Sequence, residues 1–173
     1  MTVVAGIDPG KAGALAILFP DGSVEFHDVP VIETKTPSKT NKSGYTVKTV
    51  PAWTEWQDAW VNALTLAGVD CVFIELVTAG QNGVKQGVQS MFNFGGTLRF
   101  AHAIALSPRP RPRVEFVTPA VWKPKFGLLH GSKGASREKC RTLFPTTAPK
   151  LKREKDDGRA EAALIAEYGR KHL

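Results

Sequence analysis

The sequence contains few cysteines and no long run of apolar residues. Only Cys71 and Cys140 occur among its 173 residues, too few for a disulfide framework, and we expect two idle thiols in a reducing compartment. The absence of any stretch of 18 apolar residues excludes a membrane-spanning helix. The first residues lack a basic segment followed by an apolar core, so we expect no signal peptide and a cytoplasmic location. The four histidines are not spaced as metal ligands.

Positive charge, in contrast, is in excess and is concentrated in one part of the chain. The sequence holds 23 Lys and Arg residues against 16 Asp and Glu, a formal net charge of +7. Thirteen of the basic residues lie between Ser107 and Lys155, where only three acidic residues oppose them. A basic region on a globular domain is typical of a protein that binds nucleic acid, although an ordinary soluble surface gives the same composition.

The pattern of apolar residues predicts one α/β domain that spans residues 1–173. Strands are expected at 2–7, 14–19, 24–29, 70–76 and 113–117, and helices at 53–66, 88–106, 120–126, 132–144 and 158–172. Three antiparallel strands followed by alternating helices and strands predict a mixed five-stranded sheet flanked by helices. The polar stretch 32–51 is interpreted as a flexible basic loop, and 146–155 as a linker.

Acidic residues stand at the ends of two predicted strands. Asp8 follows the first buried strand, and Glu75 ends the fourth. If these strands lie side by side and parallel, both carboxylates emerge at the carboxyl edge of the sheet, where open α/β sheets bind ligands. Taken singly, Asp8 before Pro9 is also an ordinary turn residue, and Glu75 an ordinary partner for a lysine.

Three further acids open the last predicted helix. At 3.6 residues per turn, Asp157 and Glu161 lie about 40° apart, whereas Asp156 and Glu161 lie about 140° apart. Asp157 and Glu161 therefore share one face, which would bring them toward Asp8 and Glu75. Acidic residues near a helix start are also favoured by the helix dipole alone, so this pair by itself does not identify a site.

Four converging carboxylates repel one another unless they surround cations. Ligands that are all oxygen favour Mg²⁺ or Mn²⁺ over zinc. The sequence therefore predicts two such ions held by Asp8, Glu75, Asp157 and Glu161, with Asp156 as the substitute for Asp157, and no small-molecule cofactor. Two ions at about 3.5–4 Å can activate a water and stabilise the leaving oxygen in phosphodiester cleavage.

Six short segments follow one another along nearly the whole chain. They are Gly6–Gly10 with Gly13–Leu15, Phe73–Glu75, Ser90–Gly95, Val117–Lys123, Ser132–Ser136 and Asp157–Ala162. This ordered set resembles the RuvC-type Holliday junction resolvases of the RNase H-like superfamily, in their phage and bacterial branch. The resemblance implies an RNase H-like fold and a metal-dependent endonuclease, a homodimer that nicks two opposing strands of a four-way DNA junction symmetrically.

The resemblance also assigns roles to individual residues. Asp8, Glu75, Asp157 and Glu161 match the metal-binding acids. RuvC itself separates its last two acids by three residues, and position 158 here is Gly, which leaves the choice between Asp156 and Asp157 open. Lys133 matches a lysine near the scissile phosphate and would neutralise charge in the transition state, or only position a phosphate.

Several polar residues are candidates for contact with DNA. They are Lys35, Lys39, Lys42 and Lys48 on the polar stretch, Gln81, Asn82, Lys85 and Gln86 after Glu75, and Lys123, Lys125 and Lys133. Phe92 and Phe94 are wedge or dimer candidates, although core positions are the commoner role of such residues. Trp53, Trp56 and Trp60 are expected in the core. The helices at 53–66 and 88–106 are the candidate dimer interfaces.

Three other functions remain open at this point. A non-catalytic junction-binding protein would share the fold but would not need the acids. An ATP-binding protein of the actin and sugar-kinase type shares a glycine-rich turn after its first strand, but 173 residues make only about half of such a two-lobed protein. An RNase H-type enzyme that cuts RNA–DNA hybrids would use the same acids.

Overall fold

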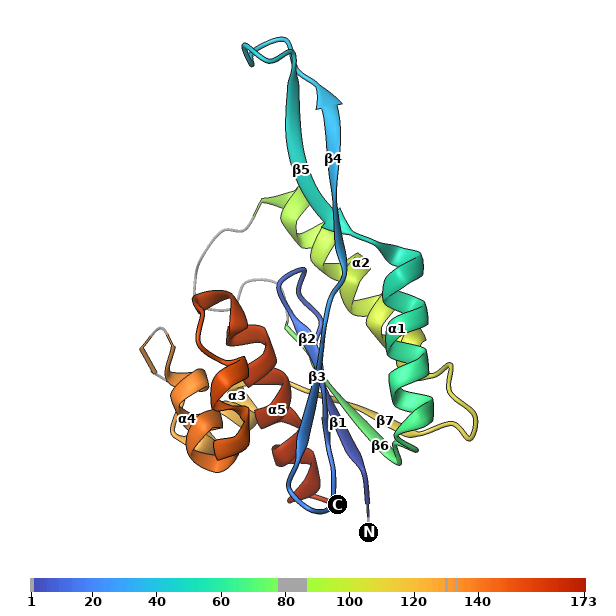
Figure 1. Cartoon of the computed structure of the whole chain (residues 1–173), viewed down its shortest axis with the longest axis vertical. Coiled ribbons are helices and arrows are strands. Elements are labelled where there is room, and N and C mark those ends of the chain that lie inside the picture. The colour runs from blue at the N-terminus through green and yellow to red at the C-terminus, as the bar shows by residue number, and fades with distance from the viewer. Residues whose placement is uncertain (1, 78–86, 130, 133) are drawn as a thin grey trace.

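The computed structural model describes residues 2–77, 87–129, 131–132 and 134–173. Its centre is a five-stranded sheet in the order β3-β2-β1-β6-β7 (Figure 1). The strands are β1 (Val4–Asp8), β2 (Ala14–Leu18), β3 (Val24–Asp28), β6 (Cys71–Glu75) and β7 (Arg113–Val117). β1, β2 and β3 pair antiparallel, whereas β1, β6 and β7 run parallel to one another. The mixed sheet predicted from the sequence is confirmed.

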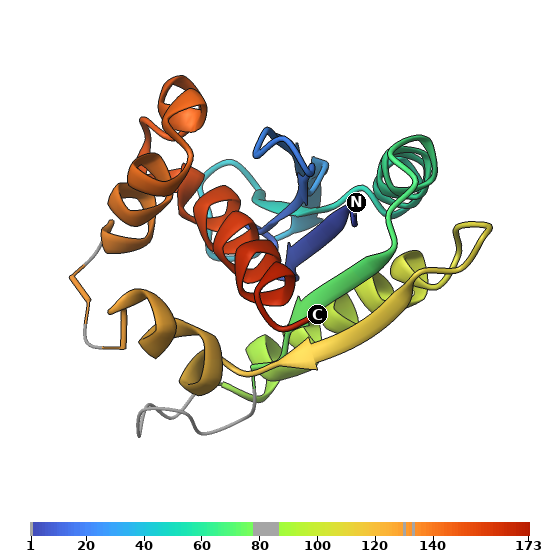
Figure 2. The ribbon, with the colours of Figure 1, turned by 90° about the horizontal axis from the view of Figure 1, so that it is seen from below.

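Helices cover both faces of this sheet (Figure 2). One face carries α1 (Trp53–Leu66) and α2 (Val88–Ala105). The other carries α5 (Asp157–Arg170), with α3 (Pro119–Trp122) and α4 (Ala135–Leu143) beside it. Short 3₁₀ turns, η2 (Lys123–Phe126), η3 (Pro145–Lys150) and η4 (Glu154–Asp156), connect these elements. The segment 146–155 is thus folded into turns, and the expected linker is wrong.

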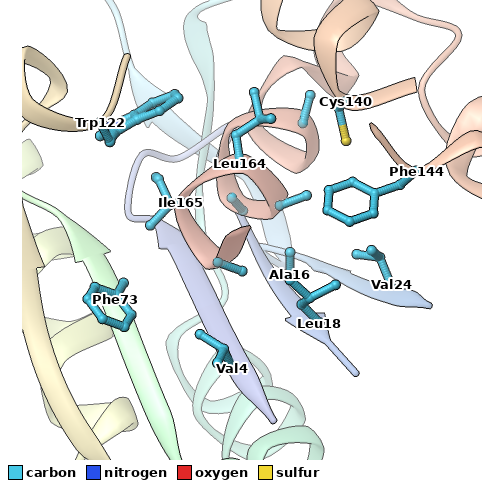
Figure 3. Close-up of a cluster of buried hydrophobic side chains, with 14 of the residues drawn as sticks. Val4, Ala16, Leu18, Val24, Phe73, Trp122, Cys140, Phe144, Leu164 and Ile165 are labelled. Atoms are coloured by element: carbon cyan, nitrogen blue, oxygen red, sulfur yellow. The ribbon is translucent and has the colours of Figure 1, made fainter. Parts of the chain in front are cut away.

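The core has two halves because the strands alternate their side chains between the two faces. Val4, Ala16, Leu18 and Phe73 meet Leu164 and Ile165 of α5 (Figure 3). Ala5, Ile7, Ile17 and Ile74 meet Trp56 and Trp60 of α1. A sheet buried on both faces gives the continuous apolar runs seen in β1 and β2. Cys71 and Cys140 are free and buried, as expected.

Helix α5 approaches the sheet closely enough to contact its backbone. A Cβ at Gly6 of β1 would lie 2.5 Å from the backbone nitrogen of Ala166 and still closer to the carbonyl oxygen of Ala162. At the start of the helix, a Cβ at Gly158 would overlap the carbonyl oxygen of Ala12. Glycine at these two positions lets α5 lie directly over β1, with its first turn against the loop that follows Asp8.

The polar stretch 32–51 is a β-hairpin, so the expected loop is wrong. β4 (Val31–Pro37) and β5 (Tyr45–Pro51) pair antiparallel along their full length, from Val31 with Pro51 to Pro37 with Tyr45. This hairpin, here called the ribbon, projects from the body of the protein beyond the sheet (Figure 1). Because both its faces are largely exposed, its residues show no single apolar side, and the sequence pattern did not reveal the strands.

Two aromatic residues that were candidates for the core lie at the surface. Trp56 and Trp60 are fully buried, but Trp53 is 44% exposed. On α2, the inward positions are Leu98, Ala101 and Ile104, and Phe92 is 77% exposed. The expected core burial of Trp53 is therefore wrong, and Phe92 does not take the core position that was one of its candidate roles.

Candidate metal centre

Asp8 and Glu75 lie side by side at the carboxyl edge of the sheet. β1 and β6 are parallel neighbours in which Ile7 pairs with Ile74. One residue further along each strand are Asp8 and Glu75, the last residues of β1 and β6. The position predicted for this pair is confirmed, and it is the edge at which open α/β sheets bind ligands.

The first turn of α5 adds the other two acids. Asp157 and Glu161 line a pocket of about 340 Å³ together with Asp8. The loop Gly10–Gly13 forms its opposite wall. Because Gly158 lets the helix touch this loop, the two acids one turn apart on α5 line the same pocket as Asp8. Asp8, Glu75, Asp157 and Glu161 are called the carboxylate cluster below.

Burial and mutual repulsion raise the pKa values of two of these groups. The pKa of Glu75, which is only 5% exposed, rises to about 8 because it is buried and because Asp8 and Glu161 lie nearby. The pKa of Asp8 rises to about 6 through its burial and the charge of Glu161. Hydrogen bonds oppose both shifts: Trp122 Nε1 donates to Glu75 Oε1 at 3.0 Å, and the amide of Gly10 donates to Asp8 Oδ1 at 3.1 Å.

The other two carboxylates are paired with cations. Lys123 Nζ lies 3.0 Å from Glu161 Oε1, which also accepts a hydrogen bond from Ser136 Oγ at 3.0 Å. Arg137 Nε donates to Asp157 Oδ1 at 2.6 Å. The cluster therefore offsets its negative charge by protonation on the sheet and by ion pairs on α5.

The cluster fits a divalent cation in composition and position. Its donors are all carboxylate oxygens, which Mg²⁺ and Mn²⁺ prefer, and the raised pKa values mark a place where added positive charge stabilises the ionised forms. In the described part of the chain, no three acidic, His or Cys side chains are already gathered closely enough to hold one ion. Glu161 and Asp157 are each paired with a cation through one of their two carboxylate oxygens.

The fold is similar to that of solved structures of Holliday junction resolvases. No protein-family model and no curated protein matches the sequence. Thermus thermophilus RuvC in complex with a Holliday junction substrate matches 99% of this chain and 96% of its own, at 15% identity and a TM-score of 0.59. The yeast mitochondrial Holliday junction resolvase Ydc2 matches 96% of this chain and 77% of its own, at 16% identity and a TM-score of 0.52. The chain has the RuvC-type RNase H-like fold. The resemblance stated from the sequence is thus confirmed for the fold.

Within this RuvC-type fold, Asp156 lies outside the carboxylate cluster. Its side chain is 3% exposed and accepts a hydrogen bond from Arg153 Nη2 at 2.8 Å, in a capping box of the 3₁₀ turn η4. Burial alone would raise the pKa of Asp156, but the hydrogen bonds from the Arg153 side chain and backbone, with the nearby Arg159, lower it overall. The geometry favours Asp157 over Asp156 as the partner of Glu161 in the cluster.

The lysines expected to contact DNA fall into distinct places. Lys35, Lys39, Lys42 and Lys48 are exposed on the ribbon and are called the ribbon lysines below. Lys125 is exposed in η2, whereas Lys123 points to Glu161 and belongs to the cluster. Lys133, Gln81, Asn82, Lys85 and Gln86 lie outside the described residues.

Sequence reasoning missed three partners of the carboxylates. Trp122 was noted only within a motif, although its indole nitrogen holds Glu75. Ser136 and Arg137 reach the cluster from α4, which is adjacent only in the folded chain. The serine belongs to one of the segments that carry the resemblance, so a signal was present for it. Arg137 was counted only as part of the basic surplus.

No helix among the described residues has the length and apolar character needed to cross a membrane.

Proposed function

We propose that the chain is a divalent-metal-dependent endonuclease that resolves four-way DNA junctions. The observation that carries the proposal is the carboxylate cluster, four acids at the carboxyl edge of a RuvC-type sheet with the pKa values of Asp8 and Glu75 raised to about 6 and about 8. Its surroundings are basic, as a polyanionic substrate requires: the chain has a net charge of +7, and the ribbon lysines project from it.

The residues of the cluster would divide the work. Asp8, Glu75, Asp157 and Glu161 would hold two Mg²⁺ or Mn²⁺ ions, which when bound activate a water and stabilise the leaving oxygen. Trp122 orients Glu75 by its 3.0 Å hydrogen bond, and Ser136 does the same for Glu161. Lys123 lies beside Glu161 and would neutralise charge on the scissile phosphate, a role that Lys133 would share.

A four-way junction has two equivalent strands to cut, so we propose a symmetric homodimer with one cluster for each cut. Helices α1 and α2 are the candidate interfaces on the face away from α5. The ribbon lysines and Lys125 would contact the phosphates of the junction arms. We propose a cytoplasmic location for this activity.

The test is cleavage of a labelled synthetic four-way junction beside a duplex and an RNA–DNA hybrid, with Mg²⁺, Mn²⁺ or EDTA. We expect paired nicks in the junction alone that require the metal. Asp8→Asn and Asp157→Asn should abolish cutting while junction binding remains, because only metal ligation is lost. The matched control is Asp156→Asn, one residue away and outside the cluster, which should still cut.

Other outcomes point to the alternatives. Cutting of the RNA–DNA hybrid and not of the junction would support the catalytic role of the carboxylate cluster but would show that the substrate is a hybrid. Tight junction binding without nicks in either metal would indicate a non-catalytic binder. Loss of cutting in Asp156→Asn with normal cutting in Asp157→Asn would reverse the assignment of the helix face.

A further inference from the structure

A groove about 910 Å³ in volume separates the base of the ribbon from the first half of α2. Figure 1 shows α2 beginning beside that end of the ribbon. Its walls include the exposed rings of Trp53 and Phe92, and Val47 of β5. Its size is that of a ligand site, and two large exposed aromatic rings in one groove need an explanation.

The groove presents the aromatic ring of Trp53 in a fixed position. Trp53 stacks on Trp56 with ring centroids 5.7 Å apart and meets the edge of Phe100 at 4.9 Å. Trp53 is therefore held by the buried ring of Trp56 and the half-buried ring of Phe100, and it exposes its remaining surface. A ring fixed in this way loses little conformational entropy when a flat partner stacks on it.

The groove is also cationic. Lys11 and Lys48 line it, and no acidic side chain is among its described lining residues. A second copy of this chain would bring the same lysines to the same surface, so like charges would meet. A polyanion is the partner that the charges favour.

A single loop connects the groove to the carboxylate cluster. Gly10, Ala12 and Gly13 line the pocket of the cluster, while Lys11 between them lines the groove. Lys11 Nζ donates to the carbonyl oxygen of Thr49 in β5 at 3.3 Å, so this lysine joins the loop to the ribbon. A strand that crosses this loop would pass from the carboxylates directly into the groove.

We infer that the groove binds unpaired nucleotides of a single DNA strand, which stack on Phe92 and Trp53 while Lys11 and Lys48 contact their phosphates. The inference rests on the proposed function, because it places the unpaired centre of the branched substrate beside the carboxylate cluster. Aromatic side chains stack on bases that are out of the helix, whereas a paired arm would offer them only phosphates and sugars.

The experiment measures binding of a short oligothymidylate in EDTA through tryptophan fluorescence. Trp53 is the exposed tryptophan, and Trp56, Trp60 and Trp122 are fully buried, so we expect quenching that disappears in Trp53→Phe. Phe92→Ala should weaken binding roughly tenfold or more, the loss expected for one base–aromatic stack. Phe92→Tyr, which keeps the ring, should restore it.

The matched control is Val88→Ala, an equally exposed apolar residue of the same helix that does not line the groove. Equal affinity for oligothymidylate in Phe92→Ala and the wild type would overturn the inference. So would sedimentation in which Phe92→Ala dissociates a dimer without changing that affinity, since the groove would then be an interface between copies.

Because binding is measured without metal, the result is independent of cleavage. If oligothymidylate binding depends on Phe92 but the protein cuts no junction, the groove is a binding site for single-stranded DNA and the nuclease proposal is wrong. If the protein cuts junctions but oligothymidylate binding does not depend on Phe92, the nuclease proposal stands and the inference about the groove is wrong.

Discussion

Replacing Glu75 by Gln should make the metal-free protein more stable at alkaline pH. In the folded protein the pKa of Glu75 is raised from 4.5 to about 8 by burial and by the neighbouring Asp8 and Glu161. This shift corresponds to roughly 4–5 kcal/mol at 1.36 kcal/mol per pKa unit. Gln has the same shape and keeps an oxygen that accepts the hydrogen bond from Trp122, but it carries no charge at any pH.

The direction of the stability change follows from which state, folded or unfolded, keeps the proton on Glu75. Below pH 4.5 Glu75 is protonated in both the folded and the unfolded chain, and the substitution changes little. As the pH rises from 4.5 to about 8, the unfolded chain releases the proton while the folded chain keeps it, so the wild type loses stability. The stability that Glu→Gln adds should therefore grow across this window and level off above it.

The assay is thermal unfolding in EDTA from pH 5 to 9. For a chain of this size, 1 kcal/mol shifts the Tm by about 2–4 °C, so the variant should melt roughly 10 °C or more above the wild type at the alkaline end. Glu55→Gln, at an exposed position in the first turn of α1, is the control and should show no such trend. Mg²⁺ should narrow the gap by stabilising the wild type more than Glu75→Gln.

A Tm difference between Glu75→Gln and the wild type that stays constant from pH 5 to 9 would refute the reasoning. It would mean that Glu75 titrates alike in the folded and unfolded chains. A variant that is less stable than the wild type at every pH would show that the charge of Glu75 is already compensated in the metal-free protein.

Three further predictions concern packing, DNA contact and the role of Asp156. Gly6→Ala should destabilise the protein by about 1–3 kcal/mol or more, because the added Cβ overlaps the backbone of Ala162. Gly95→Ala, which has open space around it, should not destabilise the protein, and thermal unfolding of the two variants tests the difference. Changing the four ribbon lysines to Gln should reduce the slope of log K against log salt for junction binding by roughly 3–4, and an unchanged slope would remove the ribbon from the interface. Asp156→Asn should lower stability at pH 7, because the ion pair with Arg153 is lost. The difference from the wild type should shrink as the pH falls, because the wild-type carboxylate, whose pKa is lowered in the folded protein, then becomes protonated and loses the same ion pair.

The sheet was predictable because its sequence signals are local and agree with one another. Strands β1 and β6 are short apolar runs that each end in an acid, and a turn sequence separates β1 from β2. The helix at Trp53–Leu66 was placed correctly from the spacing of Trp56, Trp60 and Leu64, which are its buried residues. In each case one periodicity is enough to define the element.

The ribbon was missed because burial, the signal on which the strand predictions depended, is absent there. Tyr45–Pro51 reads YTVKTVP, which is rich in the β-branched residues that favour strands. Its lysines and threonines give the stretch a low hydrophobicity, which is typical of a loop and here outweighs the propensity signal. Gly44, with a φ of 74°, is the residue before β5, where the chain turns back. A reading by propensity would have found the hairpin.

The acids of the site were predictable and their partners were not. Asp8, Glu75 and Glu161 are fixed by strand ends and helix periodicity, which depend on nearby sequence. Trp122 and Arg137 reach the same place from segments 47 and 20 residues away from the carboxylates that they bind. No local pattern specifies such contacts, because they arise when α3 and α4 pack beside α5.

The partners explain how four acids coexist before any metal is bound. On the sheet, Glu75, whose pKa is raised to about 8, relieves the repulsion by keeping its proton at neutral pH, beside Asp8 with a pKa of about 6. On α5, Glu161 and Asp157 relieve it by pairing with Lys123 and Arg137. In the proposed nuclease, bound divalent cations would supply the positive charge that the proton on Glu75 and the side chains of Lys123 and Arg137 supply in the metal-free protein. Lys123 and Arg137 would then be available beside the carboxylates to contact the phosphates of the proposed DNA substrate, so an acidic centre and a basic surround would serve one site.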